Sequence, residues 1–517
     1  MAREIEVKLQ APAAVARRLI DAPWLRRMEA APPKRERLVS VYYDTAHRAL
    51  REKGVSLRVR RIGQKRVQTV KAGPRGTCGP FCQHEWEHEI DGDRPAFDRI
   101  ADTALDQFPR KRLKRELRPI FTTDITRAAL PLRCDGSVIE LAVDRGKVRT
   151  RRRSAAISEI ELELKAGDPA ALVKLAERIA RATHASYGAA SKGERGHALA
   201  RAGEPAAVGA RAIVLDPAMT AGEAFTTIAL SCLHDFAANR DAVLAGLPEG
   251  VHQMRIGLRR LRAALSFFKE LLQDRESARI RRQLKWLLGE LGPARDLDVF
   301  IDESVVPRQR TREDGRALDT LKSELQHRRE ACIARAKKAV AGDRYRRVVL
   351  DTALWSTGGA WSRRAERALA ERREGKIADF AGAELARREH KIEKRVKRLA
   401  KLDPRRRHKL RIAAKKLRYA DEFFASLYER GSRPRRLKRH RKAAKALQSA
   451  LGKLTDMHVH DAMADNFLRP QRRAAKKPQK AFGFGFISGE DHARAKSLLA
   501  EAAKAGAALN KAKPFWN

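Results

Sequence analysis

Aliphatic and charged residues alternate in many segments of the first part of the chain. Successive side chains of a β-strand point to opposite faces, so this alternation predicts strands with one aliphatic face and one charged face. The predicted strands cover 3–9, 38–44, 55–61, 66–71, 83–90, 138–144, 147–151 and 157–165. Asp168-Pro169 is a favourable helix start, and helical spacing of apolar residues predicts helices over 12–20, 96–107 and 169–183.

The pattern changes near residue 220, where apolar residues begin to recur every three or four positions. This spacing is typical of amphipathic helices. The predicted helices cover 222–245, 251–273, 278–292, 314–341, 378–401, 405–429 and 436–458. The segment 203–218 is rich in glycine and proline and is expected to be a linker. We therefore expect an α+β domain over 1–202 and an all-α helical bundle over 219–517.

The helical part contains two segments that recur in the same order. Residues 252–262 match 408–418, and both segments begin with histidine and carry three cationic residues at the same spacing. Residues 291–299 match 451–459. The period is too long for a solenoid. The matches instead predict an internal two-fold repeat of two four-helix halves, which cover about 220–345 and 376–517.

The composition adds a strong positive charge to this picture. The 517 residues include 111 Lys and Arg against 64 Asp and Glu, so the formal net charge is +47. Such an excess predicts a polyanionic partner. Aromatic residues make up only 6%, which is few for stacking on bases, so no specific nucleic acid is expected. No apolar stretch approaches the ~20 residues of a membrane span. The charged N-terminus and the odd number of cysteines predict a reducing, cytoplasmic location.

The charged faces of the predicted strands allow two interpretations. An antiparallel sheet with one solvated face is the usual meaning of such alternation, but it would place like charges opposite one another, which costs stability. In the alternative, the strands form a barrel with the charged faces inside, where a divalent metal and phosphate would be needed as ligands. The residues that share charged faces are Glu4, Glu6 and Lys8; Arg58 and Arg60; Thr69 and Lys71; Glu85, Glu87 and Glu89; Glu140 and Asp144; Lys147, Arg149 and Arg151; and Glu159, Glu161, Glu163 and Lys165.

Several of these segments resemble the motifs of the CYTH superfamily, the triphosphate tunnel metalloenzymes. Residues 4–8 match the ExExK signature of that family. The resemblance continues in the family's order through 42–45, 57–60, 69–71, 85–87, 122–127, 140–144, 159–165 and 191–192. It implies an antiparallel tunnel barrel of eight strands, the number predicted above. Such tunnels hydrolyse tripolyphosphate with Mg²⁺ or Mn²⁺.

The resemblance also implies roles for the residues that match these motifs. The implied metal-binding and catalytic carboxylates are Glu4, Glu6, Glu161 and Glu163, with Lys8 as a catalytic cation. The implied substrate-binding cations are Lys8, Arg58, Arg60, Lys71, Arg127, Arg149 and Lys192, and the implied tunnel wall includes Glu85, Glu87 and Asp144. Oxygen ligands suit Mg²⁺, and arginine suits bidentate contact with phosphate. Gln83 stands where many relatives carry arginine, so one phosphate contact is expected to be weaker.

The helical part resembles the CHAD domain, a module with two histidine-bearing repeats that binds inorganic polyphosphate. A histidine and three cations at i, i+3, i+7 and i+10 lie on one stripe of a helix. A single stripe usually means a solvated basic face, but its recurrence in both repeats favours a binding surface. The expected polyphosphate-binding residues are His252, Arg255, Arg259 and Arg262 in the first repeat and His408, Arg411, Lys415 and Arg418 in the second. The repeat-equivalent Asp296 and Asp456 are expected to pair with these cations.

The order of a CYTH domain followed by a CHAD domain is that of bacterial inorganic triphosphatases. We therefore expect an enzyme that uses Mg²⁺ or Mn²⁺ to hydrolyse tripolyphosphate to pyrophosphate and phosphate. Its helical domain is expected to bind long-chain polyphosphate, with a steep salt dependence, at polyphosphate granules in the cytoplasm. Two alternatives stay open: a non-catalytic polyphosphate-binding granule protein, and a tunnel enzyme that uses a nucleotide or thiamine triphosphate.

Overall fold

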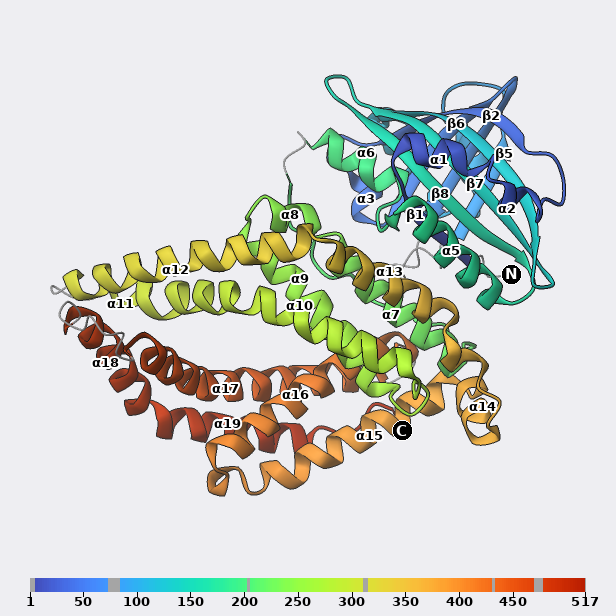
Figure 1. Ribbon diagram of the computed structural model, residues 1–517. Coiled ribbons are helices and arrows are strands. Elements are labelled where there is room, and N and C mark those ends of the chain that lie inside the picture. Colours follow the sequence, from blue (N-terminus) through green and yellow to red (C-terminus); the bar gives the residue numbers. More distant parts are fainter. Residues whose placement is uncertain are drawn as a thin grey trace. The chain divides into compact units, whose positions relative to one another are not determined.

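The computed structural model describes residues 5–72, 84–201, 205–309, 315–429, 433–468 and 478–516 (Figure 1). Its contacts divide the chain into two compact units. The first unit comprises Met1–Val214, Gly222–Leu284 and Val340–Arg373, and the second comprises Leu215–Ala221, Lys285–Ala339 and Glu374–Asn517. The first unit therefore holds the β-domain together with some of the helices that follow it in sequence. This division reflects packing, and the predicted domain boundaries at 202 and 219 stay predictions.

Nine antiparallel strands of the described chain form one rolled sheet, in the order β5-β4-β3-β2-β6-β7-β8-β1-β9 (Figure 1). The strands are β1 (Ile5–Gln10), β2 (Lys34–Asp44), β3 (Val55–Ile62), β4 (Lys65–Ala72), β5 (His84–Glu89), β6 (Arg118–Cys134), β7 (Ser137–Arg149), β8 (Ser154–Ala166) and β9 (Ser186–Tyr187). The predicted antiparallel sheet domain is therefore confirmed. The expected number of eight corresponds to the longer strands, since β9 has only two residues.

Two strand predictions were wrong in detail around Gly146. The segments 138–144 and 147–151 belong to one continuous strand, β7, as far as Arg149. Gly146 lets the backbone of β6 come close, because a Cβ atom there would lie 1.9 Å from the carbonyl oxygen of Asp124. Glycine inside a strand often marks such a close approach. None of the predicted strands falls within β6. Its threonines, alanines and prolines do not alternate with charged residues, so the pattern gave no strand signal there.

Helices cover the aliphatic face of the sheet. The helices of the β-domain are α1 (Ala13–Leu19), α2 (Pro23–Arg26), α3 (Ala49–Glu52), α4 (Arg110–Glu116), α5 (Pro169–Thr183) and α6 (Lys192–Ala200). Helices α1 and α5 pack on β8, and Leu50 of α3 and Leu113 of α4 pack on β3 and β4. The aliphatic face is almost completely buried, and the side chains that are at most 2% exposed include Val7, Leu9, Leu141, Ile160 and Leu162. The charged faces of the strands consequently turn toward the inside of the rolled sheet.

The structure confirms two of the three helices predicted in this domain. Helix α1 corresponds to 12–20, and α5 corresponds to 169–183 with Asp168 as its N-cap, which accepts a hydrogen bond from Ala170 N at 2.8 Å. The helix predicted over 96–107 was wrong. Only the short 3₁₀ helix η1 (Phe97–Ile100) forms there, because Asp102 has a φ of +61°, in the left-handed region that ends a right-handed helix.

Beyond α6, the named elements of the described chain are all helical. They are α7 (Ala221–Ala237), α8 (Arg240–Leu244), α9 (Pro248–Phe267), α10 (Arg275–Phe300), the π-helix η2 (Ile301–Val305), α11 (Val306–Gln309), α12 (Gly315–Ala341), α13 (Asp343–Gly358), η3 (Ala360–Arg363), α14 (Arg367–Glu374), α15 (Ile377–Val396), η4 (Leu399–Lys401), α16 (Pro404–Phe424), η5 (Ala425–Tyr428), α17 (Arg433–Leu468), α18 (Pro478–Ala493) and α19 (Ala495–Lys511).

The predicted all-α character of this region is confirmed. The repeated segments fall on α9 and α16 and on α10 and α17. Helices α13, α14, α18 and α19 had not been predicted, and α13 packs against α5 of the β-domain inside the first unit. Within the described residues, no helix has both the length and the apolar character needed to cross a membrane.

The second unit contains a charged cluster in its core. His440 on α17 is fully buried, with Nδ1 3.0 Å from Asp421 Oδ2 on α16 and Nε2 3.3 Å from Glu389 Oε1 on α15. Burial lowers the pKa of His440, but the two carboxylates raise it more, to about 9. The rings of Phe515 and Trp516 lie 5.3 and 5.2 Å from the imidazole, centroid to centroid. This histidine is therefore held as a buried cation among aromatic rings.

Candidate active site

The register of β7, β8 and β1 aligns charged residues in rows on the inner face of the sheet. The rows are Glu140–Glu163–Glu6, Ala142–Glu161–Lys8 and Asp144–Glu159–Gln10. The first row contains only acids, and like charges that face one another across strands are destabilising. The second and third rows bring further acids next to Lys8. The inner face therefore gathers carboxylates from three neighbouring strands.

Glu161 on β8 accepts contacts from three cations. Its Oε1 atom lies 2.6 Å from Lys192 Nζ and 3.4 Å from Lys8 Nζ, and its Oε2 atom accepts a hydrogen bond from Arg127. Its side chain is 12% exposed. Burial raises the pKa of Glu161, but the three cations together lower it well below its ordinary value. Glu161 is therefore ionised at neutral pH.

Asp144 and Glu159 complete this cluster. The Arg127 guanidinium donates two hydrogen bonds to the buried Asp144, from Nε to Oδ1 at 2.8 Å and from Nη2 to Oδ2 at 2.7 Å. Lys192 Nζ lies 2.8 Å from both Asp144 Oδ2 and Glu159 Oε2. Burial lowers the pKa of Lys192, but the carboxylates around it raise it above its ordinary value. Both cations are therefore kept charged and fixed in place.

Strands β3 to β5 contribute an excess of positive charge. Arg58 Nη2 lies 3.3 Å from Glu85 Oε1, and Lys71 Nζ lies 2.6 Å from Oε2 of the same carboxylate. Arg60 donates a hydrogen bond from Nε to Ser40 Oγ at 3.1 Å. Burial and the neighbouring Arg58 lower the pKa of Arg60 to about 10. Positive charge thus outweighs negative charge around Arg60, and a bound anion would relieve this excess.

Tyr42 on β2 belongs to the same positive region, although the sequence had suggested no role for it. Its ring stacks on Phe121 with centroids 4.5 Å apart. Burial raises the pKa of Tyr42, but Arg58 and Arg60 lower it by more, so the net shift is downward. The sequence signal that could have identified Tyr42 as a site residue was its place in the 42–45 motif.

Helix α6 brings Lys192 to the carboxylates. Ser191 and Glu194 form a capping box, in which Ser191 Oγ accepts a hydrogen bond from Glu194 N at 3.1 Å and Glu194 Oε2 accepts one from Ser191 N at 2.8 Å. Gly196 allows the helix to lie on Phe121, since a Cβ atom there would be 2.0 Å from the ring. No helix had been predicted here, although a serine followed by glutamate three residues later is a helix-start signal.

The structure brings many of the predicted site residues together and separates one of them. Those on the inner face are Glu6, Lys8, Arg58, Arg60, Lys71, Arg127, Glu161 and Glu163. Lys192 joins them from α6. Arg149 is exposed and lies an odd number of positions from Asp144 on the same continuous strand, which places it on the other face. Arg149 therefore does not join the cluster.

Other parts of the prediction concern residues at the margins of the site. Glu4 and Gln83 lie outside the described residues. Glu159 and Arg195 had been given no role, yet Arg195 Nη1 contacts Glu159 Oε1 at 2.8 Å beside Lys192. The alternation of Glu159 with Ile160 was the signal for an inward-facing acid. Arg195 reaches Glu159 from α6, so the alternation of residues in strands could not predict this contact.

The donor chemistry of the first row suits a divalent cation. Glu6, Glu163 and Glu140 offer carboxylate oxygens from adjacent strands, and such hard ligands are the ones that Mg²⁺ and Mn²⁺ prefer. Glu6 Oε1 lies 3.3 Å from Lys8 Nζ. Among the described residues, no three carboxylate, histidine or cysteine side chains already converge on one metal position. The row therefore suits a metal because its ligands are carboxylates and because they lie on adjacent strands.

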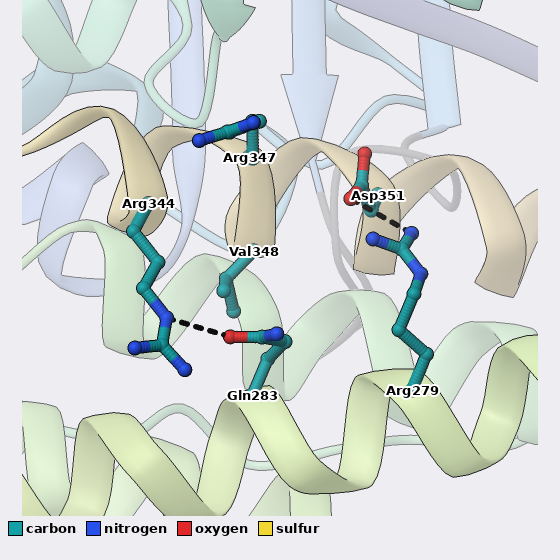
Figure 2. Close-up of a pocket in the computed structure, with 6 residues that line it drawn as sticks. All are labelled: Arg279, Gln283, Arg344, Arg347, Val348 and Asp351. Atoms are coloured by element: carbon teal, nitrogen blue, oxygen red, sulfur yellow. Dashed lines mark hydrogen bonds and ion pairs between the residues drawn. The ribbon is translucent and has the colours of Figure 1, made fainter.

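A separate pocket of about 250 Å³ lies between α10 and α13 in the first unit (Figure 2). Figure 2 shows Arg344 Nε directed at Gln283 Oε1, at 2.9 Å, and Arg279 paired with Asp351, at 2.8 Å between Nη2 and Oδ2. The exposed Arg347 also lines it. Two of its arginines are thus engaged by neutral or acidic neighbours, which differs from the excess of positive charge around Arg60.

The cationic stripes of the helical region lie on α9 and α16, in different units. On α9, Arg255 is buried while Arg262 is exposed. On α16, Arg411 Nη2 lies 3.4 Å from Asp456 Oδ1, which confirms the predicted pairing of Asp456 with a stripe cation. Arg418 donates a hydrogen bond from Nε to Gln448 Oε1 at 2.6 Å. A groove shared by the two stripes stays a prediction.

Comparisons with known proteins agree with the two-part organisation. The CYTH domain family matches residues 2–196, and the CHAD domain family matches residues 227–465. An inorganic triphosphatase of Haemophilus influenzae is 28% identical over 202 residues, which are 38% of this chain and 55% of that protein. The chain thus spans about half the length of this curated relative.

Solved structures of other proteins are also similar to parts of this chain. The CHAD domain from the plant Ricinus communis is 30% identical, with a TM-score of 0.50 over 60% of this chain and 98% of that chain. A putative adenylyl cyclase from Hippeastrum, described as having a dominant triphosphatase activity, is 20% identical with a TM-score of 0.25 over 39% of this chain and 96% of that chain. The family matches and the likeness to the Ricinus domain confirm the resemblance found in the sequence: this chain belongs to the proteins in which a CYTH domain is followed by a CHAD domain.

Proposed function

We propose that this protein is a metal-dependent inorganic triphosphatase that hydrolyses tripolyphosphate to pyrophosphate and phosphate. The observation that carries this proposal is the inner face of the sheet, where ionised acids and an excess of cations lie side by side. Such cations suit phosphate oxygens, and such acids suit a hard metal ion. The similarity of the CYTH region to an inorganic triphosphatase supports the same substrate class.

The cations would hold the phosphate chain. Lys8, Arg127 and Lys192 meet at Glu161, and Arg58 and Arg60 extend the positive surface from β3. Phosphate oxygens would compete with the carboxylates for these donors. Phosphoryl transfer depends mainly on positioning and on neutralisation of charge, and this arrangement would supply both.

Glu6 and Glu163, together with Glu140 in the same row, would hold the metal, for which we propose Mg²⁺ or Mn²⁺. A bound ion of this kind neutralises phosphate oxygens and polarises the phosphorus for attack. Glu4 of the same motif would add a further carboxylate.

Glu161 would act by holding the cations in place. A carboxylate with a strongly lowered pKa is a poor general base, and the pKa of Glu161 is lowered by its three cation partners. Water oriented by the site would attack the terminal phosphorus while the bond to the pyrophosphate oxygen breaks, and the proton that the water loses would pass to a phosphate oxygen. Lys192 and Arg127, which the carboxylates hold in this cluster, would stabilise the charge that develops on that leaving group.

Phosphate release from tripolyphosphate with Mg²⁺ or Mn²⁺ tests this proposal. We expect Glu161→Gln to lower kcat/KM about 100-fold, the cost typical of removing one preorganised charge interaction. Glu52→Gln on α3, an exposed acid of the same domain, is the matched control and should keep full activity. Equal release by wild type and Glu161→Gln, or none by wild type, would contradict the proposal. ATP and thiamine triphosphate in the same assay distinguish the other tunnel activities.

For the CHAD domain, we propose binding of long-chain polyphosphate through the α9 and α16 stripes, and with it an association with polyphosphate granules in the cytoplasm. The support is the net charge of +47 and the recurrence of histidine with three cations at equal spacing. Titration of the full chain with polyphosphate and with duplex DNA of equal charge, at several salt concentrations, tests this. Equal affinity and equal salt slope would indicate a general anion binder instead.

A further inference from the structure

The helix that carries Lys192 is held by residues that lie beyond the CYTH region. Glu194 uses its Oε2 atom in the capping box with Ser191. Its Oε1 atom faces outward, 3.4 Å from His234 Nε2 on α7 and 3.4 Å from Arg211 Nη1 in the segment that precedes α7. The carboxylate therefore joins the first turn of α6 to α7 and to the segment before α7, which lie beyond the residues matched by the CYTH family.

The two residues that meet Glu194 are themselves fixed. Arg211 Nε lies 3.5 Å from Asp235 Oδ1, and its carbonyl oxygen accepts a hydrogen bond from Arg260 at 2.9 Å. Arg260 is fully buried and also pairs with Asp235. His234 is buried as well. The contact with α6 consequently starts from buried residues of α7 and α9 that are joined by ion pairs and a hydrogen bond.

The predicted linker is held in the same way. Asn239 of the α7–α8 connection accepts a hydrogen bond from Val208 N at 2.8 Å and donates one to Val208 O at 2.9 Å. Such a pair fixes the backbone of Val208 much as a strand partner would. The segment that carries Arg211 is therefore docked on α7 within the first unit and does not behave as a free tether.

We propose that Glu194 is a positioning residue for the phosphate-binding Lys192, and that Arg211 and His234 hold it, so that α7 and the segment before it set the geometry of the CYTH active site. This inference rests on the proposed function for its effect on catalysis. Lys192 is the first residue of α6, so a shift of that first turn moves its ammonium group relative to Glu161, Glu159 and Asp144. Small misplacements of binding groups cost up to about 100-fold in rate.

The variants for the test are Glu194→Gln and Arg211→Met in the full chain. The matched control is Arg346→Met, which removes a hydrogen bond of 3.0 Å from α13 to Ala185 O and so also breaks a contact between the CHAD helices and the β-domain, away from α6. Thermal unfolding of each variant checks folding. We expect Glu194→Gln and Arg211→Met to lower kcat/KM for tripolyphosphate roughly 10-fold or more, and Arg346→Met to leave it unchanged.

A protein that already lacks the Lys192 ammonium group shows whether Glu194→Gln acts by misplacing Lys192 or by destabilising the whole protein. In Lys192→Met, we expect Glu194→Gln to have no further effect on tripolyphosphate affinity, because the group that it positions is gone. An equal loss in both backgrounds would overturn the inference. Restoration of activity by Glu194→Asp, in part or in full, would support it.

The rate at which a chemical reagent modifies Lys192 reports on the position of this side chain and does not depend on enzyme activity. Lys192 is 11% exposed, and Lys8, at 25%, serves as the internal reference. We expect several-fold faster modification of Lys192 in Glu194→Gln, with Lys8 and the Arg346→Met variant unchanged. Unchanged protection of Lys192 would overturn the positioning role, whereas an inactive wild type with altered labelling would count against the proposed function alone.

Discussion

The inner face of the β-sheet and the cationic stripes of the helices carry the same side chains in different surroundings. Lys192, which reaches the inner face of the sheet from α6, contacts three carboxylates within 2.8 Å. Arg411 on α16, in contrast, is 31% exposed and contacts Asp456 at 3.4 Å. Charge interactions strengthen as water is excluded and weaken where it is present. Removal of one charge should therefore be costly in the sheet and modest on the helices, and the following experiments test this difference.

The largest effect is expected from Arg127→Met. The substitution removes both guanidinium hydrogen bonds of the buried Asp144 and leaves Lys192 as its cationic partner. Breaking a buried ion pair destabilises a protein by about 3–5 kcal/mol, and the contact with Lys192 makes the lower end of this range the expected cost. Arg37→Met is a matched control on the same sheet, because Arg37 makes the same two-bond contact with Asp124 but is 67% exposed. Its loss should change the free energy of unfolding much less, because solvent screens an exposed ion pair. Chemical denaturation measures both, and equal costs would contradict the comparison.

The buried His440 cluster tests whether burial, rather than the sheet, makes charges important. The pKa of His440 is raised to about 9 in the folded protein, from about 6.5 in an unfolded chain. A raised pKa stabilises the fold fully below the unfolded value, and that contribution disappears as the pH rises through the folded value. We expect up to roughly 3 kcal/mol to be lost between pH 6.5 and pH 9.

Thermal unfolding across this pH range measures the loss for the wild type. His440→Gln should flatten the profile by lowering stability at the acidic end. The control His408→Gln replaces an exposed histidine on α16 and should leave the pH dependence intact. If wild type and His440→Gln show the same profile, the His440 cluster is not the source of the pH-dependent stability.

Arg60 should separate stability from binding in the same site. Burial, and after it the neighbouring cations Arg58 and Arg127, lower the pKa of Arg60 to about 10, so its charge is costly in the free protein. Arg60→Met should therefore stabilise the free protein by about 0.5–1 kcal/mol, as relief of functional strain commonly does. The same change should weaken tripolyphosphate binding, because a phosphate donor is lost. Denaturant unfolding and calorimetric titration measure the two quantities, and a destabilised variant with full affinity would show that Arg60 is structural.

The smallest effect is expected on the helices. Arg411→Gln removes one partly exposed charge, so polyphosphate affinity should fall only several-fold. The slope of log affinity against log salt should decrease by about one, since one fewer counterion is released. Titrations at several salt concentrations measure this. An unchanged slope would place Arg411 outside the binding surface, and Arg367→Gln on α14, an exposed arginine of the first unit, serves as the control.

Much of the site could be read from local patterns. Alternation alone identified Glu161 and Arg58 as members of the charged faces, because the two faces of a strand are set by parity. The same reasoning failed at Arg149, because two strands were predicted over 138–144 and 147–151, whereas one strand continues through Gly146. Parity counted along the whole of β7 would have placed Arg149 on the outer face.

The sequence by itself determined which residues share a face and where sheet gives way to helix, because these depend on neighbours a few positions away. Only the tertiary structure decided that Glu163 lies between Glu140 and Glu6, or that Lys192 reaches Glu161 from a helix closed by a capping box. Register and docking join residues far apart in the chain, and the packing of the whole sheet selects one pairing among many that local propensity allows equally.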